Sequence, residues 1–179
     1  IISKSGTYEL SGSTLAHIEI YAQGDSEITV RLANGTSVTP DNSNVPSNTA
    51  ALIINAYADS SGTPRVSIVT EENAQASLKG ANGGSGVAVT SANLNQSALP
   101  VTEPVVSFDG ESGSTLRVSS DMTTGMALSS ALGPNASTAA VAITGGTLVA
   151  TGDSRPAIIC EIPLKIMGTA RVEATSDEA

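Results

Sequence analysis

Few residues in this sequence have side chains suited to chemistry, and three of them fall close together. His17, the only histidine, alternates with Glu19 and Tyr21. In a strand this alternation places the three on one outward face, while Ile18 and Ile20 face the core. Glu19 could orient His17 as a base, but a nucleophilic triad also needs a positioned serine, and the sequence contains no G-x-S-x-G. A solvated histidine on a strand is the simpler interpretation.

Contact with a sugar would use an aromatic ring, because one apolar side of a pyranose can stack on it. Three tyrosines and one phenylalanine are the only aromatic residues. Tyr21 is the best candidate, since it shares an outward face with two polar residues, whereas Phe108 alternates with Val106 and is expected in the core. Outward-facing arginines could add hydrogen-bond donors. The candidate carbohydrate-binding residues are therefore His17, Glu19, Tyr21, Arg31, Arg65 and Arg117.

Calcium is bound by oxygen atoms of Asp, Asn and main-chain carbonyls, commonly in turns. The candidate ligands share turn-like surroundings and are Asp41, Asn42, Asn44, Asp59, Asp109 and Glu111. None of them has EF-hand spacing. Short Asx side chains also form turns without any metal. Calcium is therefore a candidate cofactor, and turn formation is the alternative role for these residues.

Catalysis is a further alternative for the acidic residues. Glycosidases need two carboxylates roughly 5–9.5 Å apart across a cleft. Asp109 with Glu111, and Glu71 with Glu72, are pairs of this kind in sequence, but no aromatic residues flank them to form a wall. The glycine-rich run 80–86 lacks the G-K-[S/T] ending of a phosphate loop and is expected to turn a corner. We expect a protein without catalytic residues, with a polysaccharide lyase or hydrolase as an alternative.

The charge balance restricts the partners. The chain has 17 acidic and 8 basic residues, for a net charge of -9. No basic stripe is available to displace counterions from nucleic acid, and an acidic membrane surface is disfavoured for the same reason. No apolar run is long enough to predict membrane insertion. The single cysteine, Cys160, excludes an internal disulfide and is expected to be a small buried residue.

A short sequence motif recurs along the chain and predicts the strands that position these candidates. A Gly or Ser, a Thr and then alternating apolar and polar residues begin at positions 6, 114, 146 and 168. The apolar residues are aliphatic, which suits layers stacked at the strand spacing of about 4.8 Å. The motifs at 114, 146 and 168 begin 32 and 22 residues apart (146 minus 114, 168 minus 146). Repeats of this length indicate structural units that each cover the apolar edge of the next. We predict an all-β fold, a right-handed parallel β-helix (β-solenoid) of about seven or eight coils at roughly 22 residues each.

The alternation also assigns the two faces of each strand. Residues expected to face inward are Ile28, Val30, Leu32, Val66, Ile68, Leu116, Val118, Ala170 and Val172. Two stretches, 90–104 and 122–140, interrupt this alternation of apolar and polar residues. The first is expected to leave the coil, and the second could carry a turn of helix.

Several phrases resemble the β-helical repeat modules of large cell-surface proteins from Gram-positive and gut bacteria, a group associated with carbohydrate binding. They are the opening G-T-Y-E-L-S-G at position 6, E-N-A-Q-A-S-L-K-G at position 72 and I-T-G-G-T-L-V-A-T at position 143. A related branch of that group binds calcium and acidic polysaccharide. The resemblance implies a secreted bacterial protein, located extracellularly or in the cell wall. Its metal ligands do not transfer to particular residues here.

We therefore expect residues 1–179 to form a single β-helix domain, part of a larger exported protein with neighbouring domains. The expected function is adhesion or binding of carbohydrate, including acidic polysaccharide or a host or cell-surface glycan. A purely structural stalk that displays other domains is the alternative from another class.

Overall fold

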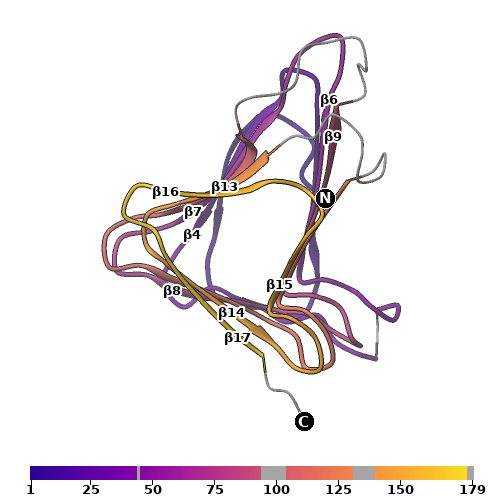
Figure 1. The fold of residues 1–179 in the computed structure, drawn as a ribbon, viewed down its shortest axis with the longest axis vertical. Coiled ribbons are helices and arrows are strands. Elements are labelled where there is room, and N and C mark those ends of the chain that lie inside the picture. Colours follow the sequence, from indigo (N-terminus) through magenta and orange to yellow (C-terminus); the bar gives the residue numbers. More distant parts are fainter. Residues whose placement is uncertain (44, 94–103, 131–139, 177–179) are drawn as a thin grey trace.

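The computed structural model describes residues 1–43, 45–93, 104–130 and 140–176. In these ranges the chain forms 17 strands and no helix. The strands make three sheets in which every neighbouring pair is parallel. Figure 1 shows the sheets as the three sides of a prism. The part of the chain that is described contains no helix able to span a membrane.

Each sheet takes every third strand of the chain. The β1 sheet consists of β1 (Gly6–Leu10), β4 (Glu27–Leu32), β7 (Arg65–Thr70), β10 (Pro104–Gly110), β13 (Ala140–Thr144) and β16 (Leu164–Met167). The β2 sheet consists of β2 (Ser13–Thr14), β5 (Ser37–Val38), β8 (Gln75–Lys79), β11 (Thr115–Ser119), β14 (Thr147–Gly152) and β17 (Arg171–Ser176). The β3 sheet consists of β3 (Ile18–Gln23), β6 (Leu52–Ala58), β9 (Val87–Asn93), β12 (Met126–Ser130) and β15 (Ile158–Cys160).

The winding is right-handed. In Figure 1 the late strands lie nearest the viewer, and the chain passes from the β1 sheet on the left to the β2 sheet below and the β3 sheet on the right. A chain that turns anticlockwise as it approaches the viewer is a right-handed coil, the hand expected for parallel crossovers. The prediction of a parallel β-helix is confirmed.

The coils are fewer and longer than predicted. Sheets of six, six and five strands correspond to about six coils, not seven or eight. Gly6 pairs with Ile28, at a distance of 22 residues (28 minus 6), but Ser67 and Ser107 meet across 40 residues. The corners of the central coils are long, and corner length is not constrained by the alternation within strands. The predicted repeat length was therefore wrong for the central coils, which are longer.

The core is a column of stacked aliphatic side chains. In the β1 sheet one ladder runs through Tyr8, Val30, Ile68, Phe108, Ile143 and Ile166. Val30, Ile68, Phe108 and Ile143 are at most 3% exposed. The predicted inward residues of the central coils are buried, and Ala170 and Val172 in the last coil are half-buried. Strand alternation thus identified the core correctly.

Some local predictions were wrong. Thr90 belongs to β9 and Pro104 begins β10, so the first interruption narrows to 94–103, which lies outside the described residues. In the second stretch, residues 122–125 form neither helix nor strand, 126–130 form β12 and Ala140 begins β13, while 131–139 lie outside the described residues. Asp109 lies in a strand and not in a turn.

Cys160 is exposed, contrary to the prediction that it is buried. It pairs with the inward-facing Leu128, which is 1% exposed. The side chain therefore belongs to the inward ladder, but among the described residues β15 is the last strand of its sheet.

Candidate functional site

Two tyrosines meet on the outer face of the β3 sheet. Tyr21 on β3 and Tyr57 on β6 have ring centroids 5.8 Å apart at an interplanar angle of 65°, an edge-to-face pair. The strand register brings them together, because Tyr21 is opposite Asn55 and Gln23 is opposite Tyr57. Tyr21 is 42% exposed. The pair therefore offers an aromatic surface to solvent.

One side of this pair is bordered by a chain of hydrogen bonds. The Tyr21 hydroxyl donates to Gln23 Oε1 at 3.1 Å, and Gln23 Nε2 donates to Asp59 Oδ2 at 2.9 Å. Asp59 Oδ1 accepts from the hydroxyl of Ser61 at 2.6 Å and from its main-chain N–H at 2.7 Å. These donors, with the Ser61 hydroxyl first, hold the pKa of Asp59 below its ordinary value. Asp59 is therefore a fixed carboxylate at the end of the chain of bonds.

The other side is bordered by an amide and a second carboxylate. The Tyr57 hydroxyl donates to Asn55 Oδ1, and Asn55 Nδ2 donates to Glu19 Oε1, both at 3.4 Å. Burial, with a smaller contribution from Tyr21, raises the pKa of Tyr57 and so favours the protonated hydroxyl. We call the six residues the tyrosine face: Glu19, Tyr21, Gln23, Asn55, Tyr57 and Asp59.

Small residues continue this surface along the solenoid. In the register of the sheet, Asn55 is followed by Thr90 and Ser129, and Ile53 is followed by Ala88 and Ala127. The hydroxyls of Thr90 and Ser129 are 3.2 Å apart and hydrogen-bonded. Short side chains on parallel strands leave a low surface beside the rings, on which an extended polymer could lie.

The structure brings together only part of the predicted carbohydrate-binding set. Glu19 and Tyr21 share the tyrosine face, and His17 is exposed just before β3. Arg31 and Arg65 lie on strands of the β1 sheet, and Arg117 lies on β11 of the β2 sheet. The three arginines therefore lie on strands of other sheets than the tyrosines.

Sequence reasoning missed most of the tyrosine face. Asn55 and Tyr57 alternate with buried residues in Leu52–Ala58 and could have been recognised as outward-facing. Their proximity to Tyr21 could not have been recognised, because it depends on the length of the coil between Tyr21 and Asn55, which is 34 residues (55 minus 21). Asp59 was predicted as a metal ligand, but its two oxygens accept hydrogen bonds from Ser61 and Gln23.

Arg31 connects three coils at the corner between the β1 and β2 sheets. Its Nε is 3.1 Å from Glu71 Oε1 and its Nη2 is 2.9 Å from Glu111 Oε1. Glu111 also accepts a hydrogen bond from the main-chain N–H of Glu72 at 2.9 Å. These contacts, with Arg31 first, lower the pKa of Glu111. Both oxygens of this predicted metal ligand are therefore engaged in holding neighbouring coils together.

The other predicted metal ligands are dispersed. Asp109, on the outer face of β10, accepts hydrogen bonds from Ser107 at 2.6 Å and from Thr144. Asp41 Oδ1 accepts from the Ser43 N–H at 3.0 Å, which is an Asx turn. Asn44 lies outside the described residues. Among the described residues, no three His, Cys, Asp or Glu side chains are grouped closely enough to hold a metal ion.

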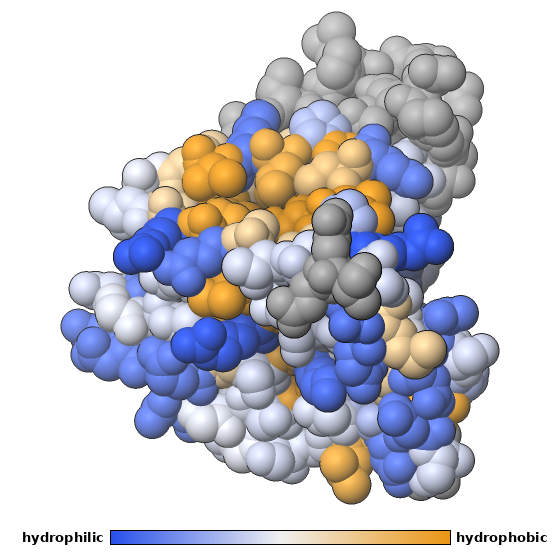
Figure 2. All heavy atoms as spheres, turned by 60° about the horizontal axis from the view of Figure 1, so that its bottom comes forward, coloured by the Kyte–Doolittle hydropathy of each residue, from blue (hydrophilic) through white to orange (hydrophobic). Residues whose placement is uncertain are grey.

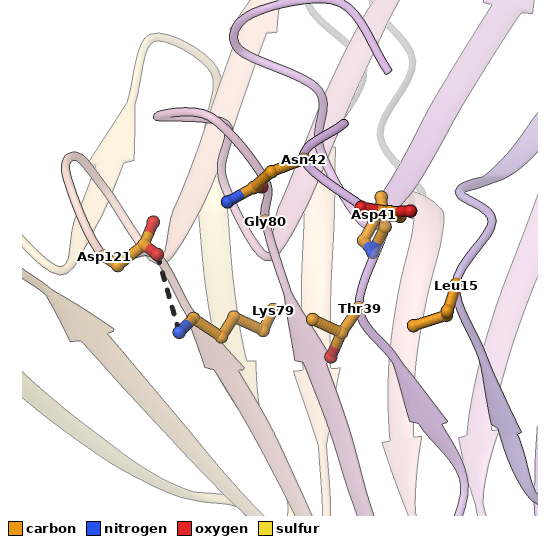
Figure 3. A pocket seen from close by; sticks show the side chains of 8 residues that line it. Leu15, Thr39, Asp41, Asn42, Lys79, Gly80 and Asp121 are labelled. Carbon is orange, nitrogen blue, oxygen red and sulfur yellow. Dashed lines mark ion pairs between the residues drawn. The ribbon is translucent and has the colours of Figure 1, made fainter. Parts of the chain in front are cut away.

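A pocket of about 400 Å³ lies beside Asp41, at the corner between the β2 and β3 sheets (Figure 3). An ion pair between Lys79 and Asp121, 3.5 Å apart, borders it. Asn42 accepts a hydrogen bond from the Asn82 N–H at 3.1 Å, and its carbonyl accepts one from Asn82 Nδ2 at 2.9 Å. The polar side chains here connect successive coils, and the pocket contains no aromatic residue.

Comparisons with known proteins do not identify a family: no family model, curated protein or solved structure matches this chain.

Proposed function

We propose that this protein is a non-catalytic module of the bacterial cell surface that binds carbohydrate through the tyrosine face. The observation that carries the proposal is the edge-to-face pair of Tyr21 and Tyr57 between two hydrogen-bonded carboxylates. An extracellular or cell wall-associated location agrees with the resemblance of the repeat phrases to surface β-helices.

The chemistry of the face fits a sugar chain. The apolar side of a pyranose stacks on an aromatic ring, and its hydroxyls pair with amides and carboxylates. Gln23 and Asn55 provide the amides, and Glu19 and Asp59 accept hydrogen bonds. Because both carboxylates are negative, an acidic polysaccharide would need a bridging cation such as calcium.

The test is a glycan array followed by calorimetry, with and without EDTA. Tyr21→Ala should weaken binding at least about tenfold, since about 1.4 kcal/mol of stacking corresponds to that factor. Arg117→Ala is the matched control, because Arg117 is outward and exposed but lies on β11 of the β2 sheet. Equal losses in the two variants, or no loss in Tyr21→Ala, would reject the tyrosine face as the binding surface.

A structural stalk is the second candidate, and the Arg31 network favours it. The ion pairs of Arg31 with Glu71 and Glu111 tie three coils together, and the aliphatic column runs through every coil. Both features stiffen a rod without requiring a ligand. Absence of binding to neutral and acidic glycans, with and without calcium, would favour the stalk.

A further inference from the structure

None of the eight basic residues of the chain belongs to the β3 sheet. Its five strands contain neither Lys nor Arg. Lys4 and Arg155 lie outside the strands, and the other six lie on the β1 and β2 sheets: Arg31, Arg65, Lys165, Lys79, Arg117 and Arg171. Figure 2, in which the β2 sheet comes forward, shows blue hydrophilic residues spread over that side of the prism. The β3 sheet therefore offers no positive charge from its own strands.

The charged residues of the tyrosine face are negative, and they lie at its two ends. Glu19 comes two residues before Tyr21 on β3, and Asp59 comes two residues after Tyr57, just beyond the end of β6. Because Tyr21 is opposite Asn55, Tyr57 lies two residues further along the strand direction than Tyr21. The order along the strands is therefore carboxylate, ring, ring, carboxylate, in steps of about 6.6 Å.

The two carboxylates are too far apart to share one metal ion. Glu19 is opposite Ile53, and Asp59 comes six residues after Ile53, so the main chains of the two acidic residues are roughly 20 Å apart. Calcium holds its oxygen ligands at about 2.3–2.6 Å, and the two side chains are too short to reach one ion across this distance. Two separate positive groups, on different units of a polymer, match the two carboxylates better.

An ammonium group suits both the rings and the carboxylates. A cation over the face of a tyrosine is attracted by the ring, and an ammonium N–H forms a charge-assisted hydrogen bond to a carboxylate. Glu19 Oε1 accepts one long hydrogen bond, of 3.4 Å, from Asn55, whereas the bonds that Asp59 accepts from Ser61 and Gln23 are 2.6–2.9 Å long. Glu19 is thus the less engaged carboxylate and the better acceptor for a charged donor.

Among sugar chains, this arrangement favours one that is positively charged. An acidic sugar is repelled by both carboxylates and by the net charge of -9. A neutral sugar gains the stacking and the hydrogen bonds but no attraction of charge. A lysine-rich peptide supplies ammonium groups, but its aliphatic side chains have no flat apolar face to stack on the pair of Tyr21 and Tyr57. An amino sugar supplies both.

We propose that the ligand of the tyrosine face is a polymer of amino sugars with free, protonated amino groups, such as β-1,4-linked glucosamine. This assignment rests on the proposed binding of carbohydrate by this face and names the class of sugar. Pyranose rings stack on Tyr21 and Tyr57, while ammonium groups of different units pair with Glu19 and Asp59. No bridging metal ion is needed, so EDTA should leave the affinity unchanged.

Calorimetry with two matched sugars tests the proposal. A glucosamine hexamer and its fully N-acetylated counterpart have the same backbone, and acetylation removes the positive charges. In a buffer that keeps the amines protonated, the glucosamine hexamer should bind at least about tenfold more tightly, through cation–π contacts and ion pairs together. Added salt should weaken its binding, and so should Tyr21→Ala.

The outcomes separate this proposal from carbohydrate binding itself. Equal or tighter binding of the N-acetylated hexamer, or of any other neutral or acidic glycan, with a loss in Tyr21→Ala, overturns the amino-sugar assignment and leaves sugar binding by the tyrosine face intact. Absence of binding to both hexamers and to every other glycan overturns both. A lysine hexamer that binds as tightly as the glucosamine hexamer also overturns the assignment, because charge alone would then explain the affinity.

A pair of charge-removing variants checks where the ammonium groups bind. Glu19→Gln keeps the shape of the side chain and an oxygen for Asn55, but it removes the charge, and should weaken binding of the glucosamine hexamer about two- to fivefold, the size of an exposed ion pair. Glu9→Gln is the matched control, because Glu9 is exposed on β1 of another sheet and its loss changes the net charge equally. Equal effects of the two substitutions, or no effect of Glu19→Gln, overturn the proposal.

Discussion

Replacing Ile54 by Ala tests the stacked core most directly. Ile54 lies on β6 between Ile20 and Val89 and is 0% exposed. The substitution removes three carbons, which at about 0.8 kcal/mol each contribute about 2.4 kcal/mol of transfer free energy. The cavity adds about 24 cal/mol per Å³, about 1–2 kcal/mol if most of the removed volume stays open. The expected loss in the free energy of unfolding is about 3–4 kcal/mol.

The adjacent residue provides a matched control. Ile53 is the same residue type on the same strand, but it faces outward between Glu19 and Ala88 and is only half-buried. Ile53→Ala leaves no enclosed cavity and should cost about 1 kcal/mol or less. Urea unfolding followed by circular dichroism measures both variants. Equal losses, or a larger loss for Ile53→Ala, would refute the assignment of faces, since a shift of one residue exchanges them.

Two further predictions concern the corners of the coils. Glu111→Gln removes the negative charge that pairs with Arg31. The fold lowers the pKa of Glu111. The ionised carboxylate therefore stabilises the folded protein above the unfolded-state pKa of about 4.3, and this stabilisation is lost as pH falls through the folded-state pKa. The melting temperature of the wild type should therefore exceed that of the variant near neutral pH, and the gap should close in acid; a gap independent of pH would contradict the ion pair. Gly84→Ala should destabilise the fold by about 1–3 kcal/mol, because the added Cβ would lie 2.1 Å from the carbonyl oxygen of Thr49. An unchanged melting temperature for Gly84→Ala would show that this close approach of two coils is absent.

The alternation of residues predicted which side chains form the core. Ile28, Val30 and Leu32 are each 1% exposed, as their spacing indicated. The glycine-rich run 80–86 forms a corner, also as predicted. Gly83 there has a positive φ of 83° and Asn82 one of 50°, whereas Gly80 and Gly84 are required by close contacts with neighbouring backbone. The glycine pattern therefore predicted the corner, and the tertiary structure shows which contacts require glycine there.

The candidate site was predicted only in part, because its residues come from different coils. Tyr21 was recognised from its own strand, but its partner Tyr57 was not. Arg31 was assigned to a sugar, yet it pairs with Glu111, 80 residues away. Asp109 and Glu111 are close in sequence, but Asp109 bonds to hydroxyls on the β1 sheet and Glu111 bonds to Arg31 at a corner.

The sequence by itself determined a parallel solenoid with an aliphatic interior, because a period of two assigns every strand residue to one of two faces. The tertiary structure decided how many coils there are and which outward residues become neighbours. Corner length sets the offset between stacked strands, and it varies from coil to coil with no periodic signal in the sequence. The tyrosine face and the Arg31 network are both consequences of that offset.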